Sequence, residues 1–219
     1  KGSEVCVKSN ACLGFTGGAT TDAQGFFKTR AGGSLRVDGG GSVCFTGLTS
    51  GARGAIIGFT GSGSVVVTSG VFQLTGSGNP ALQIARGEFA DGYFEAAGSS
   101  RVDVAQLIVG MYGKQNQPAT GRLEVKGDST FTLGNTTAYV PHYQAGSGIN
   151  NTGIVAVSGN ALLTYQGANF YLGYAGGPTT NSRGELRITG SGRFVAPSGI
   201  VQCGNSYGGS SLFGIQDNG

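Results

Sequence analysis

Residues 121–127 read GRLEVKG, so polar and apolar residues alternate between two glycines. Shortly afterwards, residues 129–134 read STFTLG and alternate in the same way. Alternation with a period of two is typical of a β-strand that has one face in a core. The two runs therefore predict two short strands joined by a turn near Gly127, where glycine can adopt a positive φ.

This pattern recurs along the chain at intervals of 29 to 32 residues. The residues two and four positions after each start are apolar in all seven repeats, and a second apolar pair follows about ten positions after the start. A third and looser apolar run, as in residues 55–58 and 107–110, comes before the next repeat. The repeats start at Ser3, Gly33, Gly63, Gly92, Gly121, Gly153 and Gly184, and Gly214 is the expected start of an eighth.

Three short strands in about 30 residues predict one coil of a right-handed parallel β-helix, an all-β solenoid of about seven coils. Residues 1–219 would then form a single domain, a segment or subunit of a longer assembly. One coil cannot bury its apolar residues alone, whereas stacked coils bury them together at about 4.8 Å per rung. The strands of an antiparallel sandwich do not require apolar residues that recur at a constant interval of about 30 residues, and a propeller blade has four strands instead of three. Both alternatives therefore fit the sequence less well.

Composition narrows the function classes. Glycine supplies 44 of 219 residues without the period of three that collagen requires, and charged residues make up 11%. The net charge of +3 is too small and too scattered to predict a nucleic-acid partner. No apolar run approaches the roughly 20 residues of a membrane helix, so we expect no membrane insertion of this segment. No charged-then-apolar leader opens the sequence, so any secretion signal would be removed or lie outside it.

The repeats resemble those of a known group of surface proteins. Residues 184–194, GELRITGSGRF, followed by an apolar third run that ends in glycine, are similar to the Gly-rich repeats of bacterial autotransporter-type passenger domains and related giant surface proteins. The resemblance implies a right-handed β-helix at the cell surface that serves as a stalk, adhesin or filament. It brings no catalytic residues, and the expected ligand of such an adhesin is a carbohydrate or another host-surface molecule.

One pair of acidic residues raises the alternative of a polysaccharide-degrading enzyme, a lyase or glycoside hydrolase. Glu95 and Glu124 share an outward position in successive coils, with Asp91, Arg122 and Lys126 nearby. Other coils have unrelated residues at this position, so we interpret the pair as a polar patch and predict no catalytic residue. The single histidine, His142, is expected in a loop without a partner. We likewise predict no cofactor and no metal site.

The four cysteines contain no CxxC pair, which argues against zinc. Cys12 and Cys44 are expected on the same outward face of adjacent coils, two positions out of register, with Cα atoms about 8 Å apart. We favour a Cys12–Cys44 disulfide, with Cys6–Cys12 as the alternative. Cys203 is expected to be unpaired or bonded to another chain.

The ends and the loops are the expected contact surfaces. A β-helix has unpaired strand edges at both ends, and no cap is recognisable in the sequence. We therefore expect the ends to be covered by flanking repeats of the same chain or by head-to-tail stacking of identical copies related by translation. A ligand would be sought in loops 48–54, 111–120, 141–152 and 174–183. The residues expected at the end-to-end contact are Glu4, Val5, Cys6, Val7, Lys8, Ile215, Gln216 and Asp217.

Overall fold

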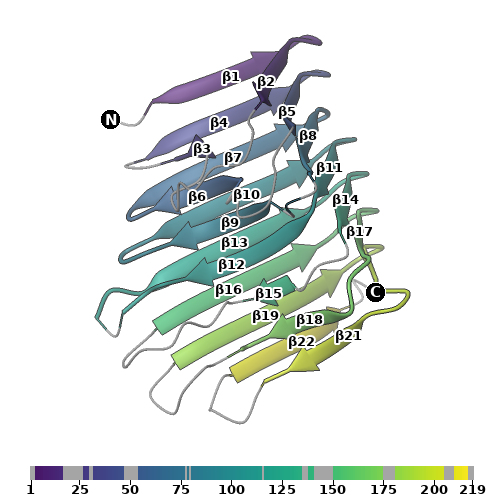
Figure 1. The fold of residues 1–219 in the computed structure, drawn as a ribbon. Coiled ribbons are helices and arrows are strands. Elements are labelled where there is room, and N and C mark those ends of the chain that lie inside the picture. Colours follow the sequence, from purple (N-terminus) through teal and green to yellow (C-terminus); the bar gives the residue numbers. More distant parts are fainter. Residues whose placement is uncertain are drawn as a thin grey trace.

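The computed structural model of the chain describes residues 3–16, 27–29, 32–46, 54–76, 78, 80–114, 116–134, 138–140, 150–174, 181–204 and 210–216. The elements formed by these residues are all β-strands, and every pair of neighbouring strands is parallel. The strands stack into a β-solenoid that runs from β1 at one end to β22 at the other (Figure 1). The described residues form no helix that is long and apolar enough to cross a membrane.

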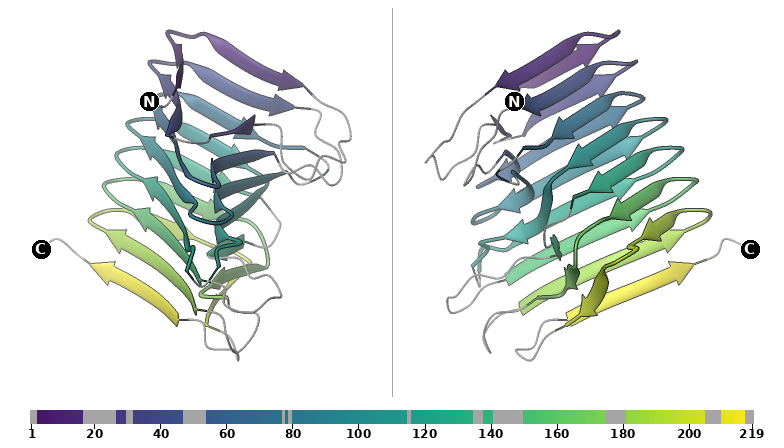
Figure 2. Two further views of the ribbon diagram at one scale, coloured as in Figure 1. Left: turned by 90° about the vertical axis from the view of Figure 1, so that its left-hand side faces the viewer. Right: turned by 45° about the vertical axis from the view of Figure 1, so that its right-hand side comes forward.

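Three sheets run along the solenoid, and each coil contributes one strand to each sheet (Figure 2). Sheet A contains β1 (Glu4–Lys8), β4 (Gly33–Asp38), β7 (Ser62–Thr68), β10 (Asp91–Ala97), β13 (Ala119–Val125), β16 (Asn150–Val157), β19 (Asn181–Thr189) and β22 (Ser210–Gln216). Sheet B contains β2 (Cys12–Thr16), β5 (Ser42–Thr46), β8 (Val71–Leu74), β11 (Arg101–Val104), β14 (Thr130–Leu133), β17 (Leu162–Tyr165) and β20 (Arg193–Val195). Sheet C contains β3 (Phe27–Lys28), β6 (Ala55–Phe59), β9 (Ala81–Arg86), β12 (Gln106–Met111), β15 (Ala138–Val140), β18 (Asn169–Leu172) and β21 (Ile200–Cys203).

The strand pairing confirms the predicted repeat. Each start glycine pairs with the next one, as Gly63 does with Gly92 and Gly92 with Gly121. The eighth start was predicted wrongly, because Gly184 pairs with Ser211 and not with Gly214. This register places Phe213 and Ile215 above Leu186 and Ile188, in the core columns. The sequence pattern also missed β3, which has two residues and so carries no alternation.

Apolar side chains fill the interior in columns that continue from coil to coil. The inward residues of sheet A are buried in the middle coils, whereas Val5 in the first coil is 48% exposed because it has a neighbouring rung on one side. Aromatic rings contact one another along the axis, from Phe27 through Phe45 and Phe72 to Phe94 and Phe131, with ring centroids 5.2 to 6.2 Å apart. The core is therefore one continuous cluster over the described coils.

The corner between sheets A and B has a positive φ in every described coil, as predicted for the turn near Gly127. The angles range from 53° to 72° at Ser9, Gly39, Ser69, Gly98, Gly127, Gly159 and Gly190. Glycine adopts this conformation without a steric cost, whereas a residue with a Cβ atom is strained there. Two coils, those with Ser9 and Ser69, therefore carry strain that the other five avoid.

We expect Ser69→Gly to stabilise the protein by about 0.5–1 kcal/mol, because it relieves the strain of a positive φ in the third coil. Urea unfolding would measure the change. The matched control is Ser158→Gly, since Ser158 precedes the corner glycine of its coil and is not among the residues with positive φ. The control should lower stability slightly, and a lower stability for Ser69→Gly as well would contradict the interpretation.

Candidate functional site

A cluster of charged side chains lies on the outer face of sheet A, where β10 and β13 pair. Glu95 is directly opposite Glu124, as the sequence predicted. The Tyr93 hydroxyl contacts a carboxylate oxygen of each, at 2.8 Å for Glu124. The Lys126 ammonium lies 2.9 Å from Glu95 and 3.7 Å from Glu124. Arg122 Nη2 lies 2.5 Å from the other oxygen of Glu124.

The two carboxylates are balanced by two cations, so this cluster of Tyr93, Glu95, Arg122, Glu124 and Lys126 has no formal net charge. Burial alone would raise the pKa of Glu124, but the Tyr93 hydrogen bond and the charges of Arg122 and Lys126 outweigh burial and lower it. The hydrogen bond with Glu95 raises the pKa of Lys126, against the effect of burial. Burial, followed by its two carboxylate contacts, raises the pKa of Tyr93 above its ordinary value, so the phenol stays protonated at neutral pH.

The lowered pKa of Glu124 predicts a pH-dependent contribution to stability. A carboxyl whose pKa is lower in the folded state stabilises the fold above its ordinary pKa of 4.5, and this stabilisation is lost as the pH falls through the folded value. We expect Glu124→Gln to cost about 1 kcal/mol at neutral pH and much less near about pH 3. Urea unfolding at both pH values measures this difference. Glu88→Gln, which removes an ion pair with Lys114 on the surface, is the control and should show a smaller pH dependence. An equal cost of Glu124→Gln at both pH values would contradict the prediction.

Two hollows lie beside the cluster on the same face. One, of about 340 Å³, is lined by Phe89, Ala90, Asp91, Pro118 and Thr120. The other, of about 210 Å³, is lined by Gly32, Ser62, Gly63, Ser64, Asp91 and Tyr93. Asp91 therefore lies between the two hollows, and it pairs in register with Ser62 of β7 and Thr120 of β13. Neither Glu95 nor Glu124 lines either hollow.

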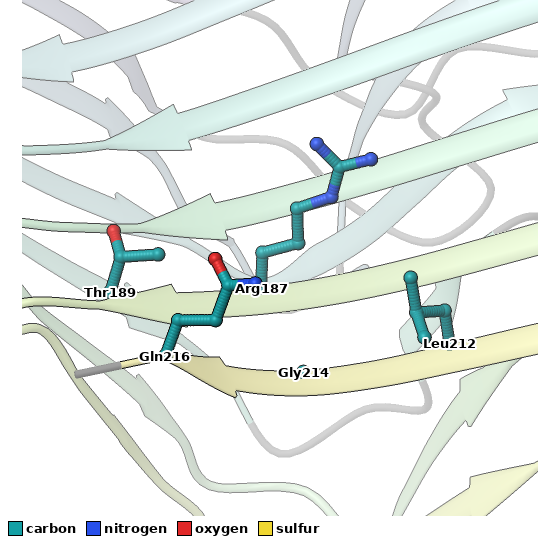
Figure 3. Close-up of a pocket in the computed structure, with 5 residues that line it drawn as sticks. All are labelled: Arg187, Thr189, Leu212, Gly214 and Gln216. Atoms are coloured by element: carbon teal, nitrogen blue, oxygen red, sulfur yellow. The ribbon is translucent and has the colours of Figure 1, made fainter. Parts of the chain in front are cut away.

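A third hollow, of about 260 Å³, lies over the last strand of sheet A (Figure 3). The hollow lies above Gly214, because glycine leaves a gap between the side chains of Leu212 and Gln216. On the neighbouring strand, it is lined by Thr189 and by the aliphatic part of Arg187. The Arg187 guanidinium points away from Gly214 and contacts Glu185, which also contacts Arg183. Glu185 is 1% exposed, so the two arginines hold a buried carboxylate at this end of the face.

The remaining sequence predictions are distributed over the molecule. The structure has four free thiols, at Cys6, Cys12, Cys44 and Cys203. Cys12 is two positions out of register with Cys44, as expected, because Gly14 pairs with Cys44. Burial raises the pKa of the Cys44 thiol, and the interaction with the Cys12 thiol raises it further. The disulfide between them stays a prediction.

Several predicted positions fall wholly or partly outside the described residues. These are His142, Asp217, most of loops 48–54, 141–152 and 174–183, and position 115 in loop 111–120. Sequence reasoning missed Tyr93 on the sheet A face and Phe89 in the turn that precedes β10. Strand alternation could have found Tyr93, which shares the outward column of Arg122. No repeat signal marks Phe89, which lies in a turn between coils.

Comparisons of the chain with models of known protein families, with curated proteins and with solved structures find no match.

Proposed function

We propose that this chain is a non-catalytic structural and adhesive solenoid of the cell surface, acting as a stalk or as a subunit of a head-to-tail filament. The observation that carries the proposal is the state of the two ends. Core-facing Val5 at one end and Phe213 and Ile215 at the other are 48%, 46% and 70% exposed. Strands β1 and β22 are also edge strands of sheet A. Such ends favour the addition of further strands, either from flanking coils or from another copy.

The sides of the solenoid fit a structural role. The paired carboxylates contact Tyr93, Arg122 and Lys126 at close range, so both are already engaged by side chains of this chain. The charge balance of the cluster also fits a polar ladder that joins successive coils. The resemblance to surface-protein repeats supports an extracellular location, with flanking repeats or another copy as the partner.

Self-association tests the filament form. Light scattering over a concentration series should show a wild-type mass that rises above 21.9 kDa, whereas Val5→Lys and Ile215→Lys should stay near that mass. Ile154→Lys is the control, because Ile154 lies on the outer face of β16, which is paired with β13 and β19 on its two sides and so is not at an end. A wild type that stays at 21.9 kDa at every concentration would refute the filament and leave flanking coils as the cover of the ends.

A second candidate is a polysaccharide-degrading enzyme, which the closely spaced Glu95 and Glu124 favour. Release of reducing ends or unsaturated products from acidic and neutral polysaccharides would be assayed for the wild type and for Glu95→Gln/Glu124→Gln. We expect no turnover by either protein. Turnover by the wild type that the double substitution abolishes would establish the enzyme and refute the structural proposal.

A further inference from the structure

Phe89 occupies a backbone conformation that normally selects glycine. It lies in the turn between β9 and β10, where the Ala90 amide donates to the Gly87 carbonyl at 3.3 Å, and its φ is 54°. The third position of such a turn usually holds glycine when φ is positive. A bulky residue there is strained, and strain of this kind is kept where a side chain has a task.

The ring of Phe89 does not serve the core, since it is 62% exposed. Tyr112, which also has a positive φ, differs because its ring lies under the Arg86 guanidinium at 5.0 Å. Among the described residues no ring or cation contact of Phe89 is found. Packing therefore accounts for the strained Tyr112 and leaves the strained Phe89 unexplained.

The turn that carries Phe89 is held in place. The Gly87 amide donates to the Met111 carbonyl at 2.8 Å, and Glu88 forms an ion pair with Lys114. Lys114 and Gln117 exchange two backbone hydrogen bonds of 2.8 and 3.0 Å, which fixes the segment that leads to Pro118. Phe89 and Pro118 therefore stand as two fixed apolar walls of the hollow that contains Asp91 and Thr120.

The polar groups of the two hollows match the hydroxyls of a sugar. The Asp91 carboxylate can accept two hydrogen bonds, and the hydroxyls of Ser62, Ser64 and Thr120 around it can donate and accept. Asp91 forms no ion pair among the described residues, while Lys114 is engaged by Glu88 and both cations of the carboxylate cluster are engaged by Glu95 and Glu124. The free negative charge of Asp91 disfavours an acidic ligand.

We propose that the face formed by Phe89, Asp91, Pro118, Thr120, Ser62 and Ser64 binds a neutral oligosaccharide. One sugar ring stacks its C–H face on Phe89 beside Pro118, and its hydroxyls donate to Asp91. The next ring occupies the hollow at Ser62 and Ser64, so the saccharide runs across β10 towards β7. This inference names the ligand of the adhesive function proposed above and rests on that function.

Isothermal titration calorimetry with the full chain tests the site. The neutral probes are cellohexaose, maltohexaose, mannohexaose and N-acetylated chitohexaose, and the acidic probe is hexagalacturonate, each at up to millimolar concentration. We expect at least one neutral probe to bind and the acidic probe not to bind. Phe89→Gly and Asp91→Asn should each weaken binding at least about tenfold, because each removes a central contact. Ile200→Ala and Asp128→Asn, at an exposed apolar and an exposed acidic position elsewhere, should bind like the wild type.

Phe89→Gly also separates binding from folding. The substitution relieves the positive φ, so its melting temperature should rise by about 2–4 °C while binding is lost. Binding that survives Phe89→Gly, binding of the acidic probe alone, or no binding of any neutral probe would overturn the proposal. So would binding of a lysine-rich peptide without saccharide binding. Because self-association is measured separately, a failure of the saccharide site is distinguishable from a failure of the stalk or filament.

Discussion

Alanine at position 92 is expected to destabilise the protein by about 3 kcal/mol or more. A Cβ atom on Gly92 would lie 2.3 Å from the Ala85 nitrogen and 2.4 Å from the Ile57 oxygen. Both are backbone atoms of strands in sheet C, so they cannot rotate away as the end of a flexible side chain could. The start glycine of the repeat therefore closes the junction between the third strand of one coil and the first strand of the next. Gly121 and Gly184 are crowded by backbone in the same way.

Urea unfolding followed by circular dichroism would measure the cost of Gly92→Ala. The matched control is Gly14→Ala in β2, because no atom lies within 4 Å of an added Cβ there and the φ of Gly14 is not positive. The control should change stability by no more than about 0.5 kcal/mol. Similar costs for the two substitutions would show that the junction tolerates a side chain, contrary to the structure.

Phe94→Ala is expected to cost about 3–5 kcal/mol. The Phe94 ring is fully buried and contacts Phe72 and Phe131, at centroid distances of 5.2 and 6.2 Å, so its loss would leave a cavity between the coils on either side. Two residues along, Ala96 occupies a column that holds valine in the neighbouring coils, which makes room for the larger ring. The neighbouring side chains are held by two paired strands and would not collapse into the space.

Phe94→Leu is the informative companion, because the neighbouring coils carry Val65 and Leu123 at this position. It should cost clearly less than Phe94→Ala, since most of the volume is kept. Urea unfolding would measure both variants. A cost below about 1 kcal/mol for Phe94→Ala would contradict the continuous aromatic column.

The fold was largely predictable because one local pattern specifies each coil. The alternation around Leu123 and Val125 predicts a strand of sheet A, and the glycines at positions 39, 98 and 127 predict the corner that follows it. Both signals depend on properties of single residues, which the sequence shows directly. The eighth coil was misplaced because a shorter connection brings Ser211, and not a glycine, beside Gly184. This register places Phe213 and Ile215 in line with the core columns, which the spacing of glycines does not report.

The candidate site was less predictable. The register that pairs Glu95 with Glu124 followed from the repeat, and so did their proximity to Lys126. The hydrogen bonds of Tyr93 to both carboxylates depend on the direction of one ring, which alternation does not specify. Phe89 was missed because what distinguishes it is a positive φ in the folded turn, and a phenylalanine in the sequence does not indicate such a conformation.

The unequal strand count of the three sheets has a consequence for any extension of the solenoid. Sheet A has eight described strands and sheets B and C have seven each, so the described chain makes seven turns and about a third of another. A copy added by translation alone would set its β1 against β22 and leave a slot one rung high, about 4.8 Å, in the other two sheets. Sheet A therefore ends one strand beyond sheets B and C. The slot is filled only by a partner that first supplies one strand to sheet B and one to sheet C. Identical copies meet this condition when each is turned by about a third of a turn relative to the one before it, so that a filament of this chain would be a screw.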